Sequence, residues 1–119
     1  MEKVTGIGGI FFRAKNPAAL TDWYEAHLGI NPVPSGAGMT PWRTSEGEVV
    51  FAPFAEDTDY FPADKQMMIN FRVADLTAMI AQLQAAGVTV FNESAMDGVG
   101  KFAHLRDPEG NAIELWEPA

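Results

Sequence analysis

One pattern occurs twice in this chain, and the repeat limits the folds that the chain can adopt. Residues 10–16 (IFFRAKN) resemble residues 69–75 (INFRVAD) at a constant offset of 59 residues. Each apolar run leads into a helix signal, and the glycines that end the two helices, Gly29 and Gly87, lie 58 residues apart. A single one-residue gap therefore keeps the copies in register, which indicates two copies of one structural unit.

Both copies carry the start and stop signals of one helix. In the first copy Asn16 can cap the helix, Pro17 suits its first position and Gly29 ends it. In the second copy Asp75 can cap the helix and Gly87 ends it. Apolar side chains recur at helical spacing between these signals, at Leu20, Trp23, Tyr24 and Leu28 and at Leu76, Met79, Ile80 and Leu83.

Short extended stretches follow each helix, separated by glycine-rich or polar turns. They lie at residues 30–33, 39–44 and 48–53 in the first copy and at 88–92, 101–106 and 112–117 in the second. We therefore predict an α+β fold with two tandem β-α-β-β-β modules, over about residues 4–54 and 66–118 of a single domain. The linker between them, about residues 55–65, carries Tyr60 and Phe61, and with Phe54 these aromatics are expected to form a lid or plug.

Composition and charge exclude several classes of protein. No cysteine is present, which excludes disulfides, thiolate zinc sites and a thiol nucleophile. The net charge of -8 argues against nucleic acid as a partner, because phosphates require clustered Lys and Arg. No apolar run approaches the length of a membrane span, and the first residues lack a signal-peptide core. We therefore expect a cytoplasmic protein that binds neither nucleic acid nor membranes.

Three motifs occur in a fixed order along the chain. An Asn-Pro pair at residues 16–17 leads into Trp-Tyr at 23–24 and Leu-Gly at 28–29, and the segment FRVADL follows at 71–76. The third and most specific is DPEGNAIEL at 107–115. Together with the tandem modules, they resemble the vicinal-oxygen-chelate superfamily of glyoxalases, bleomycin-resistance proteins and extradiol dioxygenases. The resemblance covers essentially the whole chain, and it implies a curled mixed sheet that forms a cup around a small molecule, commonly in a homodimer.

The resemblance also implies where a metal would bind. Metal enzymes of the superfamily hold a divalent ion with His, Glu or Gln side chains that project from strands into the cup. The matching positions here are Gly9, Val49, Met68 and Glu114. Glycine and valine side chains cannot coordinate, and a thioether is a poor ligand for these metals. We therefore expect no divalent metal and no other cofactor; an offset ligand set drawn from Glu48, His104 or Asn70 is the alternative.

Strand alternation separates the side chains that face the cup from those that pack on the helices. The helix side is expected to carry Ile10, Phe12, Met67, Ile69, Phe71, Ile113 and Leu115. The cup side is expected to carry Phe11, Phe51, Met68 and Trp116 as apolar walls and Arg13, Asn70, Arg72 and Glu114 as polar groups. Such a lining suits a small-molecule site. Each of these residues also has a plainer reading, as a solvated, sheet-packing or dimer-interface side chain.

Glu114 and His104 are the candidate catalytic residues. Alternation groups His104 with Phe102 and Arg106, but a bulge in the hairpin would move this group to the opposite face. If His104 faces the cup, it can form with Glu114 an acid–base pair that needs no metal. Trp42, on the predicted third strand, could stack on a flat ligand or anchor a partner subunit.

Three functions follow from these patterns. The first is metal-independent binding of a small, partly apolar molecule in the cup, and it is the interpretation that we favour. The second is catalysis by a lyase, isomerase or dioxygenase of this superfamily with a non-standard or metal-free site. The third is an interaction module whose cup is filled by its own linker.

Overall fold

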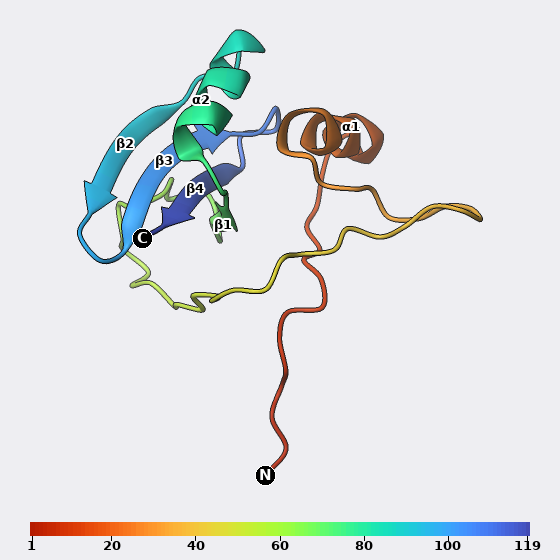
Figure 1. Ribbon diagram of the computed structural model, residues 1–119, viewed down its shortest axis with the longest axis horizontal. Helices are drawn as coiled ribbons and strands as arrows, with labels where there is room; N and C mark the ends of the chain where they lie inside the picture. The colour runs from red at the N-terminus through yellow and green to blue at the C-terminus, as the bar shows by residue number, and fades with distance from the viewer.

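The computed structural model describes residues 1–119 and contains two helices and one four-stranded sheet. The elements in chain order are α1 (Pro17–Leu28), β1 (Ile69–Arg72), α2 (Leu76–Ala85), β2 (Phe91–Met96), β3 (Gly100–Arg106) and β4 (Ala112–Pro118). The predicted α+β class is confirmed. Figure 1 shows that the sheet is curled and that all of its strands come from the second half of the chain.

The sheet has the order β1-β4-β3-β2, with β1 parallel to β4 and the other neighbours antiparallel. Helix α2 lies against one face of it (Figure 1). Ile113 and Leu115 of β4 point to that face and are almost fully buried with Leu83 of α2. This side of the sheet forms the hydrophobic core of the protein, as alternation predicts for Ile113 and Leu115.

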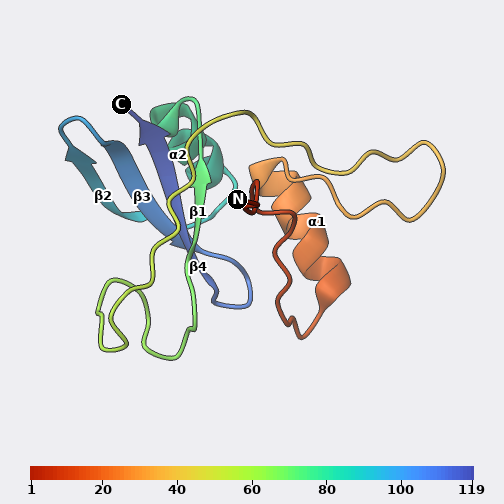
Figure 2. The ribbon, with the colours of Figure 1, turned by 90° about the horizontal axis from the view of Figure 1, so that it is seen from below.

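Helix α1 begins and ends at the predicted residues. The side chain of Asn16 accepts a hydrogen bond from the Ala19 amide at 3.1 Å, and Gly29 adopts the left-handed conformation that closes a helix, with φ 69°. The helix lies beside the sheet (Figure 2). It is attached through Tyr24, whose hydroxyl donates to Asp107 at 2.7 Å in the hairpin between β3 and β4.

The same hairpin also anchors the start of α1. The carboxylate of Glu109 accepts hydrogen bonds from the backbone amides of Lys15 at 2.6 Å and Asn16 at 3.0 Å. Asp107 meanwhile accepts bonds from the amide of Glu109 and from Asn111, which shapes the turn. The 107–111 motif therefore joins the first helix to the second module.

The second module differs from its prediction at β2. We predicted an extended stretch from residue 88, whereas β2 begins at Phe91. Helix α2 ends with Ala86 as its cap, and Gly87 has φ 82°. Val88 and Val90 then pack against the core as part of the connection, so their apolar character reflects core burial and not strand pairing.

The first copy of the repeat forms its helix but none of its predicted strands. Residues 1–15 and 29–68 contain no strand, and the N-terminal segment runs away from the sheet (Figure 1). Strands need a neighbouring strand for their backbone N–H and C=O groups, and these segments pair with no strand in the single chain. The prediction of two complete modules therefore differs from the structure, in which one complete module carries the helix of the other.

Candidate functional site

Glu114 lies on the sheet face opposite to the core. Its neighbours Ile113 and Leu115 point toward α2, and alternation along β4 turns the Glu114 side chain the other way. This carboxyl is nevertheless only 6% exposed. A buried carboxyl must have hydrogen-bond partners, because an unpaired buried charge is very costly.

His104 is one of these partners. In the antiparallel register of β3 and β4, His104 lies directly opposite Glu114, and no bulge interrupts the pairing. The two side chains therefore share one face, and His104 Nε2 lies 2.8 Å from Glu114 Oε2. The open question of which way His104 points is answered: it points to the face that carries Glu114.

Two further side chains complete the shell around Glu114. Asn70 on β1 donates through Nδ2 to Oε1 at 2.8 Å, and the hydroxyl of Tyr60 donates to Oε2. The carboxylate thus accepts hydrogen bonds from three side chains, and no buried side-chain nitrogen or oxygen in the protein lacks a partner. These donors satisfy both oxygens of the buried carboxyl.

Asn92 holds the other side of the His104 ring. Its Nδ2 lies 3.3 Å from His104 Nδ1, and with the amide nitrogen facing the ring, Nδ1 accepts and Nε2 carries the proton donated to Glu114. Asn92 is the one non-glycine residue with positive φ, 53°, and lies where the register of β2 against β3 is irregular. Strained backbone of this kind is frequent at functional sites.

Tyr60 approaches the pair from the linker. Its ring stands edge-on to the His104 ring, with centroids 5.3 Å apart, and Phe54 lies 5.7 Å from it on the other side. Burial raises the pKa of Tyr60 to about 12, and the hydrogen bond to Glu114 acts in the same direction. Of the predicted linker aromatics, Tyr60 therefore lies against the polar pair, and Phe54 packs on Tyr60.

A groove of about 610 Å³ runs beside this pair, between the linker and the open face of the sheet. The groove is lined from the linker by residues 57–63 and from the sheet side by Met68, Phe91, Asn92, His104, Leu105, Arg106, Ala112 and Ile113. Its lining thus combines apolar and aromatic side chains with polar and charged ones. This is the composition of a small-molecule site.

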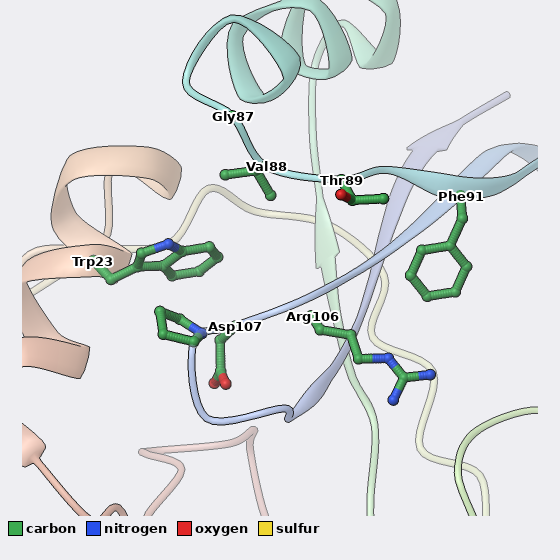
Figure 3. Close-up of a pocket in the computed structure, with 8 residues that line it drawn as sticks. Trp23, Gly87, Val88, Thr89, Phe91, Arg106 and Asp107 are labelled. Atoms are coloured by element: carbon green, nitrogen blue, oxygen red, sulfur yellow. The ribbon is translucent and has the colours of Figure 1, made fainter.

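A second hollow of about 470 Å³ lies at the rim of the sheet, between Trp23 of α1 and the start of β2. Figure 3 shows Phe91 and Arg106 projecting away from α2, with the Trp23 ring beside Val88. The Arg106 guanidinium lies 5.6 Å from the centroid of the Phe91 ring. These two residues line both the groove and the rim hollow.

Four of the predicted site residues lie at or beside the groove, and two others are engaged elsewhere. Glu114 and His104 form the polar pair, Asn70 donates a hydrogen bond to Glu114, and Met68 lines the groove. Trp116 is 9% exposed and donates its indole N–H to the Val99 carbonyl at 2.9 Å. Arg72 reaches the 45–47 turn, where it donates to the Ser45 carbonyl at 3.0 Å.

The remaining predicted residues are not brought to the groove within one chain. Phe11 and Phe51 are 93% and 85% exposed, and Arg13 is exposed as well. Trp42 packs edge-on against Phe71, with ring centroids 6.2 Å apart. Their proposed contacts with a ligand stay predictions, because the strands expected to present them are absent from the single chain.

Two site residues were not found from the sequence. Tyr60 was expected only as part of a lid, since its partner Glu114 lies 54 residues further along the chain. Asn92 was placed at the end of a predicted strand, and the local irregularity that turns its amide toward His104 leaves no clear trace in the sequence. An Asn in a strand context is a weak hint of positive φ.

Comparison with known proteins agrees with this architecture. The sequence model of the glyoxalase-like domain matches residues 9–116. The chain belongs to the glyoxalase-like domain family. The predicted membership of the vicinal-oxygen-chelate superfamily is thereby confirmed. No curated protein matches the chain significantly.

Solved structures that resemble this glyoxalase-like protein share its fold at low sequence identity. The chain is 23% identical to TnmS3, an antibiotic-binding protein from Streptomyces sp. CB03234, with 87% and 88% of the two chains covered and a TM-score of 0.56. It is 17% identical to a lactoylglutathione lyase from Agrobacterium tumefaciens, with 98% and 96% covered and a TM-score of 0.65. It is 19% identical to an integron cassette protein from V. Cholerae, with 100% and 99% of the two chains covered and a TM-score of 0.67.

The residues of this glyoxalase-like protein do not fit a metal of the kind that the superfamily uses. Gly9 and Val49 offer no donor, and Met68 offers only a thioether. Both oxygens of Glu114 are engaged by Asn70, Tyr60 and His104, and no group of three His, Cys, Asp or Glu side chains lies close enough to hold an ion.

No helix is both long and apolar enough to cross a bilayer.

Proposed function

We propose that this protein binds a small, partly apolar molecule in the groove beside His104 and Glu114, without a metal ion. The observation that carries the proposal is a buried His–Glu pair, of which His104 lines a groove whose walls include Met68, Phe61 and Phe91. The apolar walls supply the driving force for binding, and the buried polar pair gives orientation and specificity.

The donor set around Glu114 supports metal independence. A metal bound through Glu114 would have to displace Asn70, Tyr60 or His104, and each displaced group would lose its hydrogen bond. Few other ligands are at hand to compensate for that loss. The similarity to an antibiotic-binding protein is consistent with a binding function, although at 23% identity it speaks for the fold alone.

A second candidate is catalysis without a metal, as in an isomerase or lyase, and the contact of 2.8 Å between His104 and Glu114 favours it. A histidine and a carboxylate at this distance can share the transfer of one proton to or from a bound substrate. The two candidates differ in outcome: a binding protein returns its ligand unchanged, whereas an isomerase or lyase yields a product and loses its activity in both His104→Gln and Glu114→Gln.

We also propose that the protein forms a homodimer. Fifteen of the seventeen exposed large hydrophobic side chains lie in residues 1–67, among them Phe11, Val50 and Phe51. Apolar surface of this extent is unusual for a monomer and marks an interaction site. A second copy could pair its extended segments with these and complete the first-copy strands. Sedimentation velocity should then give a dimer mass at micromolar concentration, and Val50→Asp should shift it toward monomer.

The binding proposal is tested by a screen in the presence of a chelator. A panel of aromatic and drug-like compounds is added to the chelator-treated protein, and melting temperature and histidine NMR signals are recorded. We expect at least one compound to raise the melting temperature and to shift His104 but not His27, the only other histidine. Glu114→Gln should weaken the binding of that compound. Glu93 is an exposed carboxyl of β2, so Glu93→Gln serves as the matched control.

A screen in which no compound stabilises the protein until a divalent metal is restored would overturn metal independence. If Glu114→Gln and Glu93→Gln weakened the binding of the compound equally, the binding site would lie elsewhere on the molecule.

A further inference from the structure

The linker, residues 55–65, is held to the rest of the protein by very little. Its backbone hydrogen bonds are internal, from Thr58 to Ala55 and from Lys65 to Pro62. It forms no ion pair, and the Tyr60 hydroxyl makes its one hydrogen bond to a residue outside the linker. A segment with so few polar attachments can leave the sheet at small cost, provided that another group satisfies Glu114.

Tyr60 is part of the groove wall and already places a phenol on Glu114. Its side chain is a para-substituted phenol, with the hydroxyl on Glu114 and the ring edge-on to His104 at an interplanar angle of 82°. Phe54 packs against it with a tilted ring, and Phe61 packs in turn against Phe54. The shape and polarity of the site thus complement a phenol.

We propose that the groove accepts an aromatic ligand with a phenolic hydroxyl, which takes the place of the Tyr60 hydroxyl on Glu114. The inference rests on the proposed binding function and names the class of ligand for the same site. The ligand hydroxyl donates to Glu114, its ring contacts His104, and the linker moves aside or closes over the ligand.

The charges around the site narrow the choice of ligand. Asp57 and Asp59 on the groove wall, with Glu114 beside it, outnumber Arg106, the one cation of the wall, and this balance disfavours an anionic ligand. A purely apolar ligand that displaced Tyr60 would remove one donor from a buried carboxylate and gain no replacement, which is unfavourable. A neutral hydroxyl on a flat ring meets both requirements.

The test uses 4-methylphenol, the free equivalent of the tyrosine side chain, and toluene, which lacks only the hydroxyl. Tyr60→Ala removes the phenol that bonds to Glu114, and Tyr60→Ser provides a second variant should the first be poorly folded. We expect 4-methylphenol to bind Tyr60→Ala several-fold more tightly than the unmodified protein, because the tethered Tyr60 no longer competes. Toluene should bind the variant at least about tenfold more weakly than 4-methylphenol.

Affinity is measured by NMR titration, which follows His104 against His27. Combining Tyr60→Ala with Glu114→Gln should remove most of the preference for 4-methylphenol over toluene, whereas Glu93→Gln should preserve it. Equal affinities for the two probes, or tighter binding of the cation benzylammonium than of 4-methylphenol, would contradict the inference and leave the binding function intact. If the screening panel also gives no ligand, the binding function itself fails.

Discussion

The two halves of this molecule carry the same sequence pattern but differ in what they form within one chain. In the second half, four strands and α2 enclose a core in which Leu83, Leu105 and Leu115 are fully buried. In the first half, α1 forms, while the segments around Phe11 and Phe51 stay exposed. A helix is completed by its own caps and hydrogen bonds, whereas a strand depends on a neighbour. The repeat therefore specifies each helix locally, and it specifies a strand only where a neighbouring strand is present.

The largest effect should separate the two halves at matched positions. When the last strand of each copy is aligned so that Glu114 matches Val49, Leu115 on β4 matches Val50, and their side chains are 0% and 73% exposed. Leu115→Ala should lower the free energy of unfolding by about 2–5 kcal/mol, and Val50→Ala should change that of the monomer by about 0.5 kcal/mol or less. Urea denaturation at low protein concentration measures both. Equal losses would mean that the first half has a core of its own.

Glycine replacement gives the next largest contrast. Gly100 begins β3 with φ 136°, and an added methyl group would collide with the Glu117 carbonyl oxygen on the neighbouring strand. Gly38 in the first half has φ 84° and open space around it. Gly100→Ala should cost about 3 kcal/mol or more, and Gly38→Ala about 1 kcal/mol. A comparable cost at both positions would argue that the turn around Gly38 is packed as tightly as the sheet.

A smaller effect tests how α1 is joined to the second half. Tyr24→Phe removes the hydroxyl that donates to buried Asp107, which keeps its bonds from Asn111 and Glu109. We expect a loss of about 1–3 kcal/mol in the free energy of unfolding. Tyr60→Phe is the control, because Tyr60 is 45% exposed, and it should cost less. If the order is reversed, the linker contributes more to stability than the first helix.

The smallest effect concerns alkaline pH. The pKa of Tyr60 is raised from 10.0 to about 12, and burial also raises that of Tyr24, chiefly by desolvation. Because the folded pKa exceeds the unfolded value, the stabilisation from protonated Tyr60 is complete below pH 10 and is lost as the pH rises through 12. Absorbance titration should show that neither tyrosine ionises near pH 10. At higher pH, Tyr60 should ionise before Tyr24. Ionisation of one tyrosine near pH 10, absent in Tyr60→Phe, would show that Tyr60 is detached from Glu114.

Much of the fold could be predicted because its signals are local. The caps Asn16 and Asp75 mark the helix starts correctly, and Gly29 marks the end of α1. Alternation along β4 correctly assigns Ile113 and Leu115 to the core. The start of β2 was missed because Val88 and Val90 are apolar for core packing, which the sequence pattern does not distinguish from pairing.

The candidate site could be predicted only in part. Alternation gave Glu114 its face, but the face of His104 depended on the register of β3 against β4, which a single bulge would have changed. Tyr60 and Asn92 reach the pair through a long-range contact and through an irregular strand, and neither is encoded by spacing. The cup-facing positions of the first copy remain predictions, because they depend on strand pairing that the single chain does not contain.

Metal content tests the central claim, a binding site organised on Glu114 without a metal ion, most directly. The protein is purified without a histidine tag and offered nickel, cobalt, manganese, zinc and ferrous ions separately. Bound metal per chain is then measured by plasma mass spectrometry after desalting, in parallel with Glu114→Ala. We expect neither protein to retain metal. Uptake of one metal at nearly one ion per chain, lost in Glu114→Ala, would contradict it and would make a metal-dependent enzyme the better description.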